Sequence, residues 1–176
     1  LLEGDSVGWV KAKIKLAKSL STGTDRHLST EILSELESLP LSNENRIALV
    51  MTKGYVQYHQ FNYQKSIVFY EEALKLARQQ KDSLYIPLCK FKSSFSYYSI
   101  GKFDIAERYS QSSLDYFSYH QLYHEKANQL FLRYHLFDKL GRDTEALLEI
   151  KEAEYIADTY NLPATSAMAS KYLASH

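Results

Sequence analysis

The stretch Gly101-Lys-Phe-Asp-Ile-Ala106 returns 40 residues later as Gly141-Arg-Asp-Thr-Glu-Ala146, and this repeat decides the fold. An earlier copy, Tyr63-Gln-Lys-Ser66, lies 40 residues before the matching part of the first stretch. Self-similarity at a fixed period of about 20–50 residues is typical of stacked supersecondary units. The sequence therefore predicts a repeat architecture before any single residue is considered.

Apolar residues between the repeated turns follow helical periodicity, and no period-two strand pattern competes with it. Short turns between helices of roughly 17 residues favour antiparallel neighbours. We expect four helix pairs and one further helix, over about residues 6–38, 43–79, 83–119, 122–159 and 164–174. These elements predict one all-α domain over residues 1–176. The chain starts without Met and ends within the repeat pattern, so we expect it to be part of a larger protein.

Small residues recur seven positions apart on the second helix of three pairs. They are Ser66 and Ala73, Ala106 and Ser113, and Ala146 and Ala153. Seven residues make two helical turns, so each couple lies on one helix face. We expect these residues, together with Gly54 and Ser94 on the partner helices, to allow close approach of the paired helices, where a larger residue would overpack the contact.

Two residues mark expected helix starts. Asp25 is a plausible N-cap for a helix that stops before Pro40. Pro87 is unfavourable inside a helix but tolerated in the first turn. We therefore expect the fifth helix to begin near residues 84–87, or to be kinked there.

Composition limits the classes of function. Apolar residues make up 45% of the 176 and charged residues 24%, which is ordinary for a soluble globular protein. Lys+Arg and Asp+Glu balance at 21 each, so no overall field would attract nucleic acid or anionic lipid. The lone Cys89 excludes an internal disulfide framework, and no apolar run predicts a membrane span. The 15 tyrosines suit half-buried groove walls and interfaces.

The repeated residues resemble the tetratricopeptide repeat family. The resemblance is carried by Gly54 with a following Tyr, by the Gly-x-x-x-x-Ala turn, and by Ala73-Leu74 near the end of a second helix. It covers residues 47–159 well and residues 6–38 as a degenerate first pair, with a period longer than the common one of about 34 residues. The resemblance implies a right-handed α-solenoid. Long-period arrays of this kind resemble regulatory and sensor segments of bacterial signalling and transcription-regulatory proteins.

In this family the first helix of each pair lines a concave face, along which a ligand lies. Carried over by position, that face is expected to show Met51, Tyr55, Tyr58, Phe91, Phe95, Tyr98, Phe131, His135 and Asp138. Chaperone-binding members grip a terminal carboxylate there with Lys, Asn and Arg, and the aromatic residues argue against that reading. The hypothesis is an aromatic trough for an apolar peptide or an amphipathic helix. The alternative is that these aromatic residues pack against the next pair or against a further helix.

Charged stretches suggest a weaker second feature. Lys11, Lys15 and Lys18 fall at helical spacing and predict a basic ridge opposite Val10-Ile14-Ala17, which could meet an acidic peptide end or a phosphate. The favoured interpretation is a solvated helix face. The same interpretation applies to an acidic stretch on the expected convex side, formed by Glu145, Glu149, Glu152 and Asp158.

Catalytic motifs are weak. His120 and His124 have a metal-ligand spacing, but we place them on either side of a loop around Gln121. Cys89 fits a small buried residue. The sequence contains no phosphate-binding Gly-rich loop, nucleophile elbow or Cys-x-x-Cys pair. We expect no enzymatic activity, cofactor or metal.

The expected function is protein or peptide binding in the concave groove, as a regulatory or sensor segment of a larger signalling protein. The alternative is a self-association module in which end repeats stack on a second copy, with Tyr172 and Leu173 at the contact. The expected compartment is the cytoplasm, and the alternative is a periplasmic sensor segment of a membrane-anchored protein. We expect this segment to bind no nucleic acid.

Overall fold

The structure is a computed structural model that describes residues 3–23 and 25–174, with side chains from Gly8 onward. These residues form nine α-helices and no strand. The helices are α1 Glu3–Leu20, α2 Arg26–Glu37, α3 Asn43–His59, α4 Tyr63–Gln79, α5 Tyr85–Ser99, α6 Phe103–Tyr119, α7 Tyr123–Lys139, α8 Asp143–Thr159 and α9 Pro163–Leu173. The predicted all-α class is confirmed.

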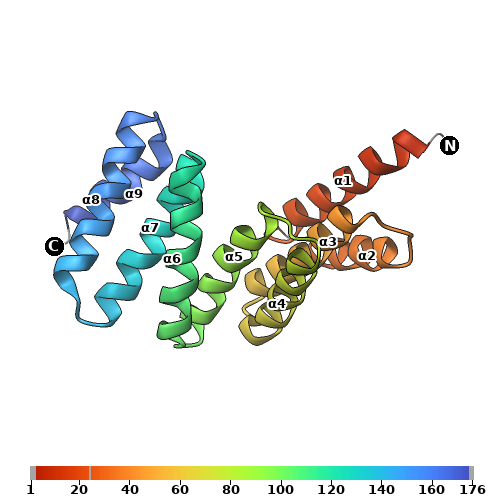
Figure 1. The fold of residues 1–176 in the computed structure, drawn as a ribbon, viewed down its shortest axis with the longest axis horizontal. Coiled ribbons are helices and arrows are strands. Elements are labelled where there is room, and N and C mark those ends of the chain that lie inside the picture. The colour runs from red at the N-terminus through yellow and green to blue at the C-terminus, as the bar shows by residue number, and fades with distance from the viewer. Residues whose placement is uncertain (1–2, 24, 175–176) are drawn as a thin grey trace. The chain divides into compact units, whose positions relative to one another are not determined.

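The chain divides into two compact units, Leu1–Ile100 and Gly101–His176, here called the N-terminal and the C-terminal unit. The N-terminal unit holds α1–α5, and the C-terminal unit holds α6–α9. Within each unit consecutive helices pack against each other and reverse direction (Figure 1). The boundary falls between the two helices of the pair expected over 83–119. Among the described helices, none is long and apolar enough to cross a membrane.

The turns from α3 onward place a residue of positive φ at the same position. A residue with positive φ recurs every 20 positions, at Phe61, Lys81, Gly101, Gln121, Gly141 and Asn161. In the turns at 61, 81, 121, 141 and 161 the following backbone N–H donates to the carbonyl five residues back, over 2.8–2.9 Å. This is the Schellman arrangement, which satisfies carbonyls at a helix end and reverses the chain.

The start of α5 is set by Asp82. Its Oδ1 atom accepts hydrogen bonds from the backbone N–H of Leu84 at 3.0 Å and of Tyr85 at 2.8 Å. Pro87 therefore lies in the first turn, where its missing N–H removes no helical bond, as expected. Asp25 stands at the N-cap of α2, as expected, although its side chain makes no capping hydrogen bond.

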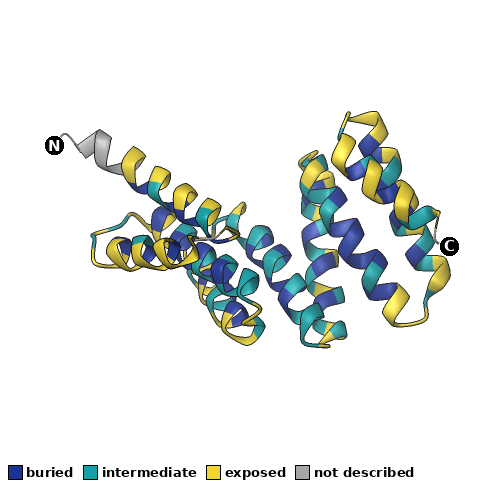
Figure 2. Ribbon diagram, turned by 180° about the vertical axis from the view of Figure 1, so that it is seen from behind, coloured by how far each residue is buried: buried dark blue, intermediate teal, exposed yellow. Residues whose placement is uncertain are grey.

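The buried residues lie on the helix faces that the periodicity of the sequence predicts (Figure 2). The core between α1, α2 and α3 consists of Val10, Ile14, Ala17, Leu33, Leu36, Leu49 and Val56. All six small residues at seven-residue spacing are fully buried, as predicted. Gly54 allows α3 to approach the Tyr70 ring of α4 closely. The hydroxyls of Ser66 and Ser96 share a hydrogen bond of 2.9 Å, which joins α4 to α5.

Within the C-terminal unit, two arginines contact the same aromatic ring and connect neighbouring helices. The guanidinium groups of Arg133 and Arg142 lie 4.8 and 4.2 Å from the centroid of the Phe137 ring. Arg133 pairs with Glu149 at 2.8 Å, and both side chains are nearly buried. Arg142 pairs with Glu107 of α6 at 3.0 Å. Glu149, expected on a solvated convex face, instead links α7 to α8.

Candidate binding site

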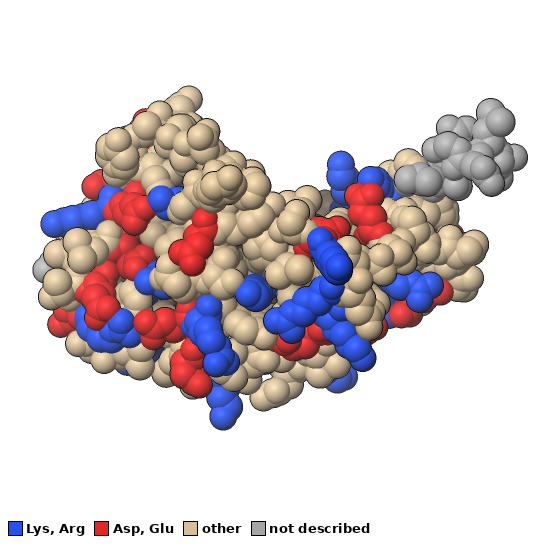
Figure 3. Space-filling model, in the orientation of Figure 1, with Lys and Arg blue, Asp and Glu red and all other residues tan. Residues whose placement is uncertain are grey.

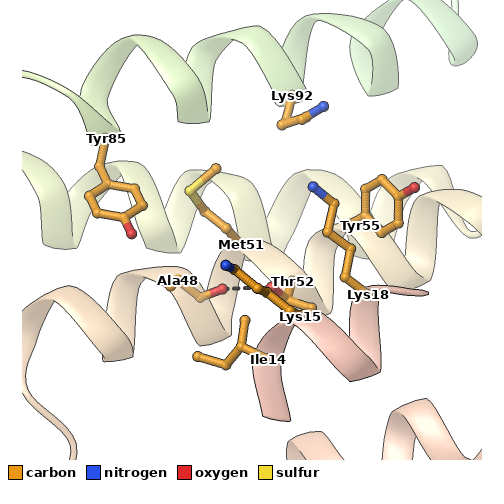
Figure 4. Close-up of a pocket in the computed structure, with 9 residues that line it drawn as sticks. All are labelled: Ile14, Lys15, Lys18, Ala48, Met51, Thr52, Tyr55, Tyr85 and Lys92. Carbon is orange, nitrogen blue, oxygen red and sulfur yellow. Dashed lines mark hydrogen bonds between the residues drawn. The ribbon is translucent and has the colours of Figure 1, made fainter. Parts of the chain in front are cut away.

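A pocket of about 220 Å³ lies in the N-terminal unit, between α1, α3 and α5 (Figure 4). Its walls are Ile14, Lys15 and Lys18 from α1, Ala48, Met51, Thr52 and Tyr55 from α3, and Tyr85 and Lys92 from α5. A second pocket of about 180 Å³ shares Tyr55 and Lys92 with the first. It is also lined by Tyr58, His59, Tyr70 and Phe95. The two are called here the lysine–tyrosine pocket.

Helical spacing explains why these side chains gather. On α3 the lining residues stand at positions 48, 51, 52, 55, 58 and 59, which is the spacing of one helix face. On α5, Tyr85 and Lys92 are two turns apart, and Phe95 follows one turn later. Both α1 and α5 pack on α3. The pocket is thus one stripe of α3 with a wall on each side.

Two lysines from different helices approach the same ring. The Lys18 Nζ atom lies 5.1 Å from the centroid of the Tyr55 ring, and the Lys92 Nζ atom lies 6.0 Å from it. Lys92 also lies 4.5 Å from the centroid of Phe91. These distances are within the range of cation–π attraction. Tyr55 therefore helps to hold two cations at the pocket.

The basic ridge expected on α1 divides in the structure. Lys15 and Lys18 line the pocket, whereas Lys11 pairs with Glu44 at 2.9 Å. All three lysines are exposed, as the interpretation of a solvated face expects, but Lys15 and Lys18 do not lie opposite the apolar stripe of α1. Each follows a buried residue of the stripe, Ile14 or Ala17, by one position, and so lies at its edge.

The pocket has a positive electrostatic character. The His59 ring lies 4.2 Å from the Tyr55 ring. Burial lowers the pKa of His59, and Lys92, Arg26 and Lys18 lower it further by repelling the imidazolium form. None of the lining residues is a carboxylate. The site therefore combines aromatic walls with the amino groups of three lysines.

The groove residues predicted on α3 and α5 have different surroundings. Met51, Tyr55, Tyr58 and Phe95 line the lysine–tyrosine pocket and are half-buried. Phe91 is 4% exposed and packs edge-on against Phe95, with ring centroids 5.3 Å apart. Tyr98 is half-buried and lines neither of these two pockets. Four of the six side chains therefore converge on one site.

The three groove residues predicted on α7 have a different environment. Phe131 is 6% exposed, and its ring lies 6.1 Å from that of Tyr172 on α9. His135 lies 4.9 Å from the same ring. Asp138 is exposed near the end of α7. The alternative left open by the sequence, packing against a further helix, describes Phe131 and His135.

Sequence reasoning missed Tyr85 and Lys92 as site residues. A signal was present, because Lys92 stands three residues before Phe95 and seven after Tyr85, on one face of α5. The predicted groove was chosen mainly from its aromatic residues, so Lys92 was not included in it. The lysines of α1 were noted as a separate feature, but their place beside the aromatic residues of α3 was missed, because the first helix pair fits the repeat poorly.

The residues considered as metal ligands or as a reactive thiol do not form a common site. His120 caps the end of α6 and His124 lies in α7, on either side of the turn at Gln121, as expected. Burial raises the pKa of the Cys89 thiol to about 12, so this thiol stays protonated at neutral pH. Over residues 8–23 and 25–174 no group of three or more His, Cys, Asp or Glu side chains could hold a metal ion.

Comparison with known proteins gives a likeness of fold. No family model matches the chain, and no curated protein matches it. The chain is similar to the crystal structure of BtubC (BKLC) from P. vanneervenii, with a TM-score of 0.65 and 14% sequence identity. The match covers 97% of this chain and 84% of that one. The protein therefore has an all-α, helical repeat-like fold.

Proposed function

We propose that this chain is a tetratricopeptide-type, right-handed solenoid that binds a protein or peptide segment and acts by binding, without catalysis. The observation that supports this function best is the lysine–tyrosine pocket, where Met51, Tyr55 and Tyr58 of α3 and Phe95 of α5 lie half-buried. Half-buried aromatic rings offer large contact areas at low entropic cost, as binding surfaces require.

The division of the pocket into two parts favours a chain segment as the ligand. The parts measure about 220 and 180 Å³, and each alone is smaller than the roughly 300–1,000 Å³ that is usual for a small-molecule site. Each part suits one large side chain of a ligand that continues along the surface. In this proposal the protein is a regulatory or sensor segment, and ligand binding changes the packing of neighbouring repeats.

Peptide selection tests this function. A random 12-residue display library is panned on the purified protein, and enriched peptides are tested against Tyr55→Ala and Tyr155→Ala. Tyr155 is the control because it is 69% exposed on α8. We expect Tyr55→Ala to weaken binding at least tenfold and Tyr155→Ala to leave it unchanged. Absence of enriched peptides, or equal binding by both variants, contradicts the proposed function.

Self-association through the last described helix is the alternative. Tyr172 of α9 already packs against the rings of Phe131, Tyr134 and His135 in its own unit. A second copy would therefore have to contact the remaining face of α9. Light scattering of the protein, with a polar substitution at Leu173 as the comparison, tests this arrangement.

A further inference from the structure

The lysine–tyrosine pocket gathers lysines from α1 and α5, and its lining holds no acidic side chain. Three other lysines of this unit are paired with carboxylates: Lys11 with Glu44, Lys13 with Glu35 and Lys53 with Glu37. For Lys15 and Lys18, no carboxylate lies within ion-pair distance among the described residues.

The net charge of the whole chain is zero, and basic and acidic side chains are interspersed over the face shown in Figure 3. The pocket departs from this pattern, because its lining holds three lysines and no acid. Like charges held on two helices repel each other across the site. An anion seated between them would remove that repulsion.

We propose that the ligand of this unit is an acidic peptide segment that places one large apolar side chain in the lysine–tyrosine pocket and its carboxylates against Lys15, Lys18 and Lys92. This inference rests on the proposed peptide-binding function and names the chemistry of the peptide. Met51, Tyr55 and Tyr85 form the apolar walls for the anchoring side chain. The lysines stand at the rim from two directions, α1 and α5 (Figure 4).

The carboxylates could be side chains within the segment or the terminus of a chain. Lysines on two different helices are arranged to meet several carboxylates spread along a peptide, which favours acidic side chains. Amidated and free-acid forms of one peptide separate the two sources. We expect amidation to change the dissociation constant less than twofold.

The test uses the peptide selection described above and examines the charge of the enriched peptides. We expect enriched peptides to combine acidic residues with one large apolar residue, and their affinity to fall between 0.05 and 0.3 M salt. Replacing acids by Gln and Asn in an enriched peptide should weaken binding at least tenfold. Each substitution Lys15→Met, Lys18→Met or Lys92→Met should weaken it about three- to tenfold.

The matched control is Lys75→Met, because Lys75 is an exposed lysine of α4 outside the pocket lining. We expect it to change affinity less than twofold. A triple Lys→Glu variant at 15, 18 and 92 should instead enrich basic peptides, provided that its circular dichroism matches the parent. That reversal cannot result from loss of folding.

The outcomes separate the two proposals. Enriched peptides that are neutral or basic, with affinity independent of salt and of the three lysines, overturn the acidic ligand and leave peptide binding intact. A Lys75→Met effect as large as that of Lys18→Met also overturns it, because the charge would then act at long range. If no peptide is enriched by the protein or by its variants, the proposed function itself fails.

Discussion

The Tyr70 ring of α4 occupies the space that a side chain at Gly54 of α3 would need. Two of its ring carbons lie 2.7 Å from the position of a Cβ atom at residue 54. Tyr70 is fully buried, so its ring has little room to move. Gly54→Ala should therefore lower the free energy of unfolding by about 1–3 kcal/mol, because the contact becomes overpacked.

A matched control exists in the same unit. Gly8 also lies within a helix, but a Cβ atom there would meet no heavy atom within 4 Å. Gly8→Ala should raise the free energy of unfolding by about 0.5–1 kcal/mol, because alanine favours helix. Urea titration followed by circular dichroism measures both variants. If both substitutions stabilise, the contact between α3 and α4 is looser than described.

The ion pair between Arg133 and Glu149 should be costly to break singly. Their side chains are 10% and 13% exposed, and burial raises the pKa of Glu149 although Arg133 opposes the shift. We expect Arg133→Met or Glu149→Leu alone to cost about 3–5 kcal/mol, because each leaves a buried charge unpaired. The double variant should lie within about 1.5 kcal/mol of the parent.

The exposed pair of Lys11 and Glu44 serves as the comparison. Glu44→Gln should cost less than about 1 kcal/mol, because solvent already screens that pair. Thermal unfolding of the four variants gives the coupling energy directly. A double variant as unstable as the sum of the two single variants would show that the buried charges act independently.

The turn at Lys81 should be improved by glycine. Lys81 has a φ of 51°, in the left-handed region where non-glycine residues are disfavoured by about 1–2 kcal/mol. Lys81→Gly should raise the free energy of unfolding by about 0.5–1 kcal/mol, after the extra freedom of glycine in the unfolded chain is counted. Lys75→Gly in the interior of α4 should lower it by about 1 kcal/mol. Chemical denaturation measures the free energy of unfolding of both variants and of the parent protein.

His59 should make stability depend on pH. Its folded pKa lies below the usual 6.5, because of burial and of Lys92, Arg26 and Lys18. The unfolded chain then binds more protons, so this contribution is fully present above about pH 6.5 and is lost as the pH falls through the folded pKa. His59→Gln should reduce the loss of stability between pH 7.5 and 5.5. Since His135 also has a lowered pKa, His135→Gln measures the remaining slope.

The helices could be predicted because their ends repeat. The two turns at Gly101 and Gly141 revealed a 40-residue period, whereas the backbone repeats every 20 residues. The turns at Lys81 and Gln121 use the same left-handed geometry with residues that do not favour it, so packing of the flanking helices imposes the conformation. Propensity alone could not show the shorter period.

The candidate site could be predicted in part. The aromatic stripe of α3 follows from the repeat, but the lysines of α1 do not, because α1 belongs to the pair that departs most from the pattern. The approach of Lys18 to Tyr55 depends on how α1 is rotated on α3, which three-dimensional packing determines. The burial of Phe131 depends in the same way on Tyr172, 41 residues further along the chain.

Lys15 and Lys18 come from α1, which packs on α2 and α3, while Lys92 comes from α5. A ligand held by all three lysines would therefore bridge α1 and α5, and docking of α1 would be thermodynamically linked to occupancy of the pocket. At a ligand concentration 100 times the dissociation constant, this linkage stabilises the docked state by about 2.7 kcal/mol. Amide hydrogens of α1 would then exchange more slowly in proportion, and their protection would report on the ligand from outside the site.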